Sequence, residues 1–358
     1  MPHFVRTPPH PTCSALLQTP QTITGVPVDN IRKMVAEQPG NVCRLARACV
    51  GRMHKAASVQ GQTPASDRQA ALNGAAILTG LLPVMFEVEG EHKLVETIFW
   101  RGMRPGAEDG EQPLPIAENL MNCVMCLLLR PGFGCDSHGC PADAPLTKSA
   151  TSRSVDVSRT ILLKLMLVTC SETLYITPDQ YKSRDNYWLR WYAAQNHAMI
   201  VPIVRSMTAT IFSYDPVGMG IPYSSTMGVD SQEALVDTTL HALIAFLDYM
   251  PAAAKAQVNG TANGGTTGGV SSVATQQVLD TVKIEHKAVS GNSFRDALRN
   301  ITGEDDVAFI FKGMSRLLNN PYQANATYLA GSIKEISCTQ ELLIVLWKLI
   351  DENKVGKD

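Results

Sequence analysis

Apolar residues recur at spacings of three and four along most of the chain, which is the pattern of helices that bury one face. Residues 42–59 show it clearly, with arginines and a lysine opposite the apolar face and Asn41 as the expected cap. Few segments show the sustained alternation typical of strands. The predicted helices cover residues 42–59, 66–86, 92–100, 114–130, 155–175, 186–194, 196–212, 231–249 (with Ser231 as cap), 293–300, 304–319 and 337–353.

This order of elements predicts an all-α fold in which antiparallel helices stack around a continuous core. The helix at 155–175 is apolar on nearly every side, so we expect it to be central. An irregular solenoid of the HEAT or armadillo type fits such pairs, although no strict repeat of about 40 to 47 residues is visible.

Differences in composition divide the chain into four segments. Residues 1–27 are rich in proline and are expected to form a disordered leader, and residues 28–250 form the first part of the helical domain. Residues 251–291 contain the glycine-rich run NGTANGGTTGG and are expected to be a mobile insert. Residues 292–358 continue the helical domain.

Charge and composition narrow the class of protein. The chain has 358 residues and a net charge of −2, which predicts no electrostatic attraction to nucleic acid. Nine cysteines without a signal peptide indicate reduced thiols in the cytosol. No window reaches about 18 uninterrupted apolar residues, so we expect no transmembrane segment.

The candidate metal ligands cluster in one region of the sequence. A zinc module or metal-dependent enzyme centred here is one alternative function. However, the first two cysteines lie inside an apolar helical run, where a thiol usually packs as a small apolar group, and this second interpretation is preferred. The candidate ligands are Cys123, Cys126, Cys135, His138 and Cys140.

The remaining residues suggest no catalytic centre. There is no G-x-S-x-G elbow, and His197, His241 and His286 stand in no catalytic context, so they are interpreted as capping, packed or solvated. We therefore expect no enzymatic activity and no cofactor. Trp188 and Trp191, three residues apart, are expected to anchor a helix in the core.

One acidic segment and one glycine-containing segment can each be interpreted as a binding site or as a structural element. Residues 304–306 could bind a cation, but they more simply place negative charge at a helix amino terminus. The stretch SYDPVGMGIPYS at 213–224 contains two glycines spaced as in a phosphate-binding loop. It follows a helix rather than a strand and lacks a third glycine, so a rigid joint between two helices is preferred.

Three stretches resemble the high-temperature-induced dauer formation family, a relative of the dymeclin family. The first is SYDPVGMGIPYS together with the preceding YWLRWYAAQNHAMIVPIVRSMTATIF, the second is VAFIFKGMSRLLNNP at 307–321, and the third is TQELLIVLWKLIDENK at 339–354. Weaker similarity extends over most of residues 28–354. The loop residues that carry the motif, with a structural or partner-binding role, are Tyr214, Asp215, Pro216, Val217, Gly218, Gly220, Ile221, Pro222 and Tyr223.

The resemblance implies a noncatalytic adaptor at Golgi and trans-Golgi membranes. It would act in protein sorting and vesicle-mediated transport from the cytoplasmic side, with other proteins of the secretory pathway and the Golgi membrane surface as partners. A generic cytosolic helical scaffold remains an alternative, since a fold does not imply a function.

Two features depart from the family pattern. Animal members look N-myristoylated through a Met-Gly start, whereas this chain begins Met1-Pro2-His3. Family members also continue for several hundred residues beyond the third matched stretch, so the chain resembles an amino-terminal portion.

Overall fold

The computed structural model describes residues 26–88, 94–101, 115–136, 139–140, 142–147, 152–179, 185–216, 229–250, 291–326 and 335–352. Within these ranges the chain forms helices and no named strand, so the all-α prediction is confirmed. The helices are α3 (Val28–Glu37), α4 (Pro39–Ser58), α5 (Ala65–Val88), the π-helix η1 (Glu96–Trp100), α6 (Ile116–Leu128), α7 (Arg153–Thr169), the 3₁₀-helix η2 (Cys170–Tyr175), α9 (Tyr187–Ala193), α10 (His197–Ser213), α11 (Val229–Asp248), α14 (Ser293–Arg299), α15 (Glu304–Ala326) and α16 (Thr339–Glu352). The expected leader at 1–27 and insert at 251–291 lie almost entirely outside the described residues.

Helices α4 and α5 form an antiparallel pair. Near the turn between them, Lys55 Nζ lies 2.8 Å from Asp67 Oδ1. Further from the turn, a Cβ on Gly74 would lie 3.1 Å from the carbonyl oxygen of Cys49. The contact partners therefore advance in opposite directions along the two helices, and Gly74 lets their backbones approach closely.

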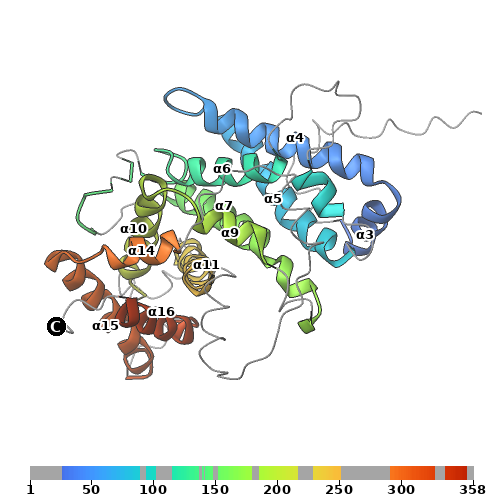
Figure 1. Cartoon of the computed structure of the whole chain (residues 1–358). Coiled ribbons are helices and arrows are strands. Elements are labelled where there is room, and N and C mark those ends of the chain that lie inside the picture. Colours follow the sequence, from blue (N-terminus) through green and yellow to red (C-terminus); the bar gives the residue numbers. More distant parts are fainter. Residues whose placement is uncertain are drawn as a thin grey trace, which may run out of the picture.

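The other long helices extend this pair into two rows (Figure 1). In one row α5 packs against α7, α7 against α11, and α11 against α16; in the other α4 packs against α6, α6 against α10, and α10 against α15. Contacts between α4 and α5, α6 and α7, α10 and α11, and α15 and α16 join the rows. Helix pairs stacked on their neighbours are the arrangement of helical solenoids.

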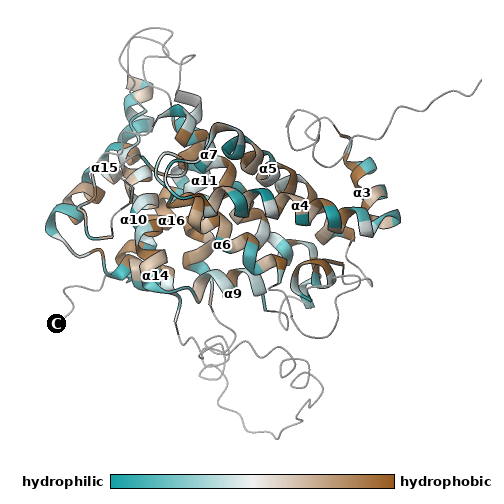
Figure 2. Cartoon of the chain, turned by 90° about the horizontal axis from the view of Figure 1, so that it is seen from above, coloured by the Kyte–Doolittle hydropathy of each residue, from teal (hydrophilic) through white to brown (hydrophobic). Residues whose placement is uncertain are grey.

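One apolar core runs through the whole stack, from Val35 in α3 to Leu349 in α16. Figure 2 shows apolar residues concentrated on the helices in the middle of the molecule, α5, α6, α7 and α11. The predicted central helix at 155–175 is thus central, although α7 ends at Thr169 and continues as the 3₁₀-helix η2.

The two tryptophans of α9 anchor that short helix, as predicted. Trp188 is fully buried, and its ring makes edge contacts with Phe99 and Trp100 of η1 at centroid distances of 5.7 and 5.1 Å. Trp188 Nε1 also donates a hydrogen bond to Glu172 Oε2 at 3.1 Å. Trp191 is buried beside it.

Helix α5 alone, among the described residues, is long and apolar enough to cross a membrane. Its best 18-residue window has a mean hydropathy of 1.6, and 67% of that window is buried inside the structure. In the stack, α5 packs against α3, α4 and α7. Its apolar composition is therefore used in helix packing within the protein.

Two predicted caps are wrong. Helix α4 begins at Pro39 with Gln38 as its cap, so Asn41 lies inside the helix and donates its amide to Gln38 Oε1 at 2.6 Å. Proline suits the first helical turn because it has no N–H to satisfy, and this signal outweighs the asparagine. Likewise, α11 begins at Val229, two residues before Ser231.

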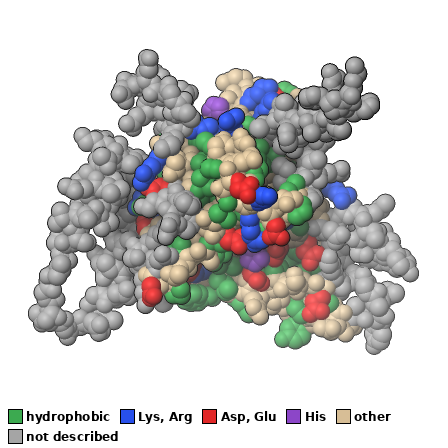
Figure 3. Space-filling model, turned by 90° about the vertical axis from the view of Figure 1, so that its right-hand side faces the viewer, with side chains coloured by type: hydrophobic (Ala, Val, Ile, Leu, Met, Phe, Trp, Pro, Cys, Tyr) green, Lys and Arg blue, Asp and Glu red, His purple; other side chains and the backbone are tan. Residues whose placement is uncertain are grey.

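The face at the α3 end of the stack carries both signs of charge side by side (Figure 3). Arg32 lies at the centre of one such group, with Asp29 Oδ1 at 2.7 Å and Glu87 Oε1 at 3.0 Å. These exposed pairs contribute little stability individually. They show interleaved charges rather than a patch of one sign on this face.

Candidate functional sites

The start of the proline-glycine loop is held by α15. Tyr214 caps the carboxyl end of α10 and is buried. Arg316 of α15 donates from Nη2 to the carbonyl oxygens of Phe212 and Tyr214, both at 2.8 Å, and from Nε to Tyr214 at 3.2 Å. The last carbonyls of a helix have no partner within it, so this arginine satisfies them.

A close approach of the two backbones completes this joint. Gly313, one turn before Arg316, lies against Phe212, and a Cβ at this position would be 2.6 Å from both the Cβ and the carbonyl oxygen of Phe212. The structure therefore joins two stretches that are distant in sequence, the end of α10 and the 307–321 segment. Tyr214, Asp215 and Pro216 are described, whereas Val217, Gly218, Gly220, Ile221, Pro222 and Tyr223 lie outside the described residues.

Replacing Arg316 with alanine should lower the free energy of unfolding by about 1–3 kcal/mol, because partly buried carbonyls lose their donors. Urea denaturation measures this change. Arg316→Lys is the matched control: it keeps the charge but cannot reach both carbonyls with a planar fork, so an intermediate loss is expected. A change below about 0.5 kcal/mol for the alanine variant would contradict this role.

The candidate metal ligands separate into two groups. Cys123 is buried on α6 with its thiol donating to Asn119 Oδ1 at 3.4 Å, whereas Cys126 is exposed. Burial, followed by the nearby Cys126, raises the pKa of Cys123 to about 12, so its thiol stays protonated. This is the behaviour of an apolar packing group.

Cys135 and Cys140 lie together after the end of α6. The Cys135 thiol has one proton to donate, either to the carbonyl oxygen of Leu129 at 3.1 Å or to the sulfur of Cys140. His138 lies outside the described residues. Within the described parts of the chain, no three His, Cys, Asp or Glu side chains come together as a metal site.

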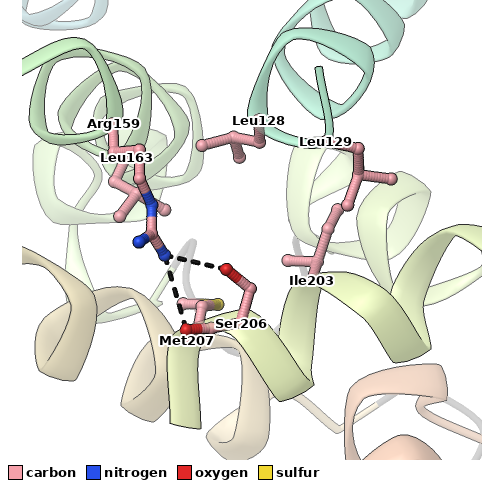
Figure 4. Close-up of a pocket in the computed structure, with 7 residues that line it drawn as sticks. All are labelled: Leu128, Leu129, Arg159, Leu163, Ile203, Ser206 and Met207. Carbon is pink, nitrogen blue, oxygen red and sulfur yellow. Dashed lines mark hydrogen bonds between the residues drawn. The ribbon is translucent and has the colours of Figure 1, made fainter. Parts of the chain in front are cut away.

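A buried arginine lies beside this cysteine pair. Arg159 of α7 is almost fully buried, and its Nη2 donates to Ser206 Oγ of α10 at 2.9 Å. Figure 4 shows this contact at the edge of a small cavity whose other walls are apolar. The apolar lining residues are Leu128, Leu129, Leu163, Ile203 and Met207. Burial lowers the pKa of Arg159, because a guanidinium ion is costly in such surroundings.

A second, more open cleft lies at the amino end of α15. Glu304, Asp305 and Asp306 occupy the first turn of this helix, as the helix-terminus interpretation predicted. Asp306 Oδ2 lies 2.8 Å from Arg205 Nη2, and its Oδ1 accepts a hydrogen bond from the Leu146 backbone N–H at 2.6 Å. Asp306 thus joins α10, α15 and the 142–147 segment, and its role is structural.

Helix α16 presents an apolar outer face. Its inner face packs on the core, while four of its six exposed residues are large and apolar; we call these four the α16 face: Leu343, Ile344, Trp347 and Ile350. Lys348 lies beneath it, paired with Asp248 Oδ1 of α11 at 2.9 Å, and its ammonium group is 5.0 Å from the Trp347 ring centre. The exposed tryptophan ring is therefore held in place.

The sequence contains a signal for two of these features. TQELLIVLWKLIDENK is apolar around most of its circumference, which indicates a helix covered on more than one side. Arg159 stands on the helix that is expected to be central, where a charged side chain indicates a buried polar contact. The approach of Ser206 and Cys140 to Arg159 had no signal, because it depends on how α6, α7 and α10 pack.

The fold and these sites define a class of protein built from stacked helix pairs, with contact surfaces along the stack. Comparison with known sequences places the chain more narrowly: residues 23–355 match the model of the High-temperature-induced dauer-formation protein family, and the chain belongs to this family. It is similar to Protein HID1 of Homo sapiens and of Mus musculus, each 31% identical over 92% of this chain and 42% of the relative. Protein HID1 of Dictyostelium discoideum is 25% identical over 67% of this chain and 28% of its own length.

The chain thus spans less than half the length of the curated relatives it matches. No solved structure matches it.

Proposed function

We propose that this chain is a noncatalytic helical scaffold that acts in protein sorting and vesicle-mediated transport at Golgi and trans-Golgi membranes. Membership of the family supports the cellular process, and the stacked architecture supports a scaffold role, since such stacks offer long surfaces to partners. The observation that carries the proposal is the α16 face, whose four large apolar side chains are exposed. Helix α16 lies beside α15 at one end of the stack (Figure 1).

The arrangement of the α16 face favours a helix as its ligand. Leu343, Trp347 and Ile350 follow one side of α16 at intervals of four and three residues, the spacing that receives the ridges of another helix. Inside the stack, the outer sides of α5, α7 and α11 are each covered by the next helix of the row. The α16 face repeats this geometry without a cover among the described residues, so we assign it an amphipathic helix of a partner protein.

Recruitment to the Golgi tests this proposal. We expect a tagged chain in eukaryotic cells to coincide with a Golgi marker and to pellet with membranes. Trp347→Ala should reduce this recruitment strongly, because removal of a central aromatic anchor typically costs about 2 kcal/mol or more, roughly 30-fold in affinity. Tyr322→Ala is the matched control, since it removes an exposed aromatic ring from α15 outside this face.

Three results would contradict the proposal. A wild-type chain spread evenly through the cytosol argues against Golgi sorting, and equal recruitment of wild type and Trp347→Ala argues against the α16 face. Binding of the purified chain to protein-free phosphatidylcholine–phosphatidylserine vesicles, lost in Trp347→Ala, would make lipid the ligand. Dimers in light scattering that Trp347→Ala dissociates would make the ligand a second copy.

A further inference from the structure

Cys135 and Cys140 lie just outside a turn that is closed by a backbone hydrogen bond between Asp136 and Gly139. The backbone N–H of Gly139 donates to the carbonyl oxygen of Asp136 at 3.2 Å, and Gly139 has a φ of +82°, which glycine adopts without strain. The side chains of Cys135 and Cys140 are hydrogen-bonded to each other. Two thiols in direct contact are the arrangement from which a disulfide can form.

The first arm of this turn is fixed to the end of α6. Gly132 N–H donates to the carbonyl oxygen of Cys135 at 2.9 Å, and the N–H groups of Phe133 and Gly134 donate to that of Arg130 at 3.1 and 3.0 Å. The Arg130 side chain in turn donates to Ala57 and Gly61 carbonyls at 2.9 and 2.8 Å. Cys135 is therefore held in one position, and the partly exposed Cys140 is brought to it.

The surroundings of Cys140 favour a negative sulfur. It hydrogen-bonds with the Cys135 thiol and the Ser206 hydroxyl, and the buried Arg159 guanidinium lies nearby. Burial and the carboxylate of Asp136 act in the opposite sense. The net effect lowers the pKa of Cys140, with the Cys135 hydrogen bond as the largest cause. The pKa of Cys135 is raised by the same hydrogen bond and by burial. Cys140 is thus the reactive nucleophile, and the Cys135 thiol stays protonated beside it.

We propose that Cys135 and Cys140 form a reversible dithiol–disulfide site that reacts with low-molecular-weight disulfides such as oxidised glutathione. The Cys140 thiolate attacks one glutathione sulfur, an S–S bond forms, and the first glutathione leaves as its thiolate. Cys135 then loses its proton and attacks the Cys140 sulfur, which expels the second glutathione. Two protein thiols are oxidised, and one glutathione disulfide is reduced to two glutathione molecules.

This reaction would change the charge at a point where three helices meet. Arg159 belongs to α7 and Ser206 to α10, and the cysteine pair follows α6, so the site lies where these three helices approach one another. A disulfide carries no charge, and its formation removes the anionic sulfur from the vicinity of the buried guanidinium. The redox state of the pair is thereby linked to the Arg159–Ser206 contact between α7 and α10.

The test uses the purified, reduced chain incubated in glutathione buffers of graded redox ratio. The samples are quenched with acid and alkylated with N-ethylmaleimide. Chymotrypsin then cuts the chain between Cys126 and Cys135, and the masses of the peptides are measured by mass spectrometry. We expect the peptide with Cys135 and Cys140 to lose two hydrogens and to resist alkylation until it is reduced. Cys135→Ser should stop at a lasting glutathione adduct on Cys140, and Cys140→Ser should remove the reaction. Cys126→Ser, at an exposed cysteine of α6, should leave it unchanged.

A second measurement does not depend on disulfide formation. At pH 7 Cys140 should react with iodoacetamide at least about tenfold faster than Cys126, because the lowered pKa of Cys140 leaves more of it as thiolate, whereas partial desolvation raises the pKa of the Cys126 thiol although its side chain reaches solvent. Circular dichroism of each serine variant checks that it is folded. Glutathione adducts on wild-type Cys140 that never resolve, or full alkylation of both cysteines at every ratio, would overturn the proposal.

Discussion

Trp188→Ala is expected to lower the free energy of unfolding by about 3–5 kcal/mol, the range typical of removing a fully buried large aromatic side chain. The indole is the centre of the contact between α9 and η1, and it also supplies the hydrogen bond to Glu172, which is itself buried. Both the cavity and the lost donor weaken the fold. Guanidinium denaturation followed by circular dichroism gives the change.

Trp347→Ala makes the same substitution at an exposed ring. Its side chain is 61% exposed, and the ring contributes mainly the contact with Lys348, so a loss below about 1 kcal/mol is expected. Similar losses for the two tryptophan variants would mean that α9 is not anchored through Trp188. The same Trp347 variant tests partner binding, so its small effect on stability keeps the two readouts separate.

Gly313→Ala should destabilise the chain by about 1–3 kcal/mol, because the new methyl group meets backbone and Cβ atoms of Phe212 and the helices must move apart. This is the opposite of the usual effect of replacing glycine inside a helix. The change in melting temperature and the urea midpoint report it, and the double variant with Arg316→Ala should lose less than the sum of the two, since both act on one joint.

Gly51→Ala is the control for the glycine substitution. Gly51 lies inside α4 with nothing within 4 Å of an added Cβ, so alanine should raise stability by about 0.5–1 kcal/mol. If Gly313→Ala also stabilised the chain, the close approach between α10 and α15 would be wrong.

The helices could be predicted because each depends on the local spacing of its own apolar residues. The starts of α9 and α10 agree with predicted helices at 186–194 and 196–212, and in both the asparagine side chain accepts from a backbone N–H of the first turn, at 3.0 and 3.1 Å. Helix α3 was missed, although Ile31, Met34 and Val35 have helical spacing. Its short, polar remainder gives a weak signal, and packing on α5 stabilises it.

The candidate sites were less predictable because they depend on tertiary contacts. Spacing alone grouped five possible metal ligands, but the helical geometry of α6 buries Cys123 and exposes Cys126, while a turn brings Cys135 to Cys140. The motif at 213–224 indicated a joint between helices, yet nothing local identified Arg316 as the residue that holds it. A side chain about a hundred positions away satisfies those carbonyls only after the rows have stacked.

The joint between α10 and α15 also has a consequence for synthesis on the ribosome. The pair α4–α5 can dock as soon as it emerges, since its partners are close in sequence. The carboxyl end of α10, in contrast, emerges 104 residues before Arg316 is translated, and until then water must solvate the Phe212 carbonyl. Nascent chains should therefore acquire protease resistance in two stages, early for the first pairs and late for α10.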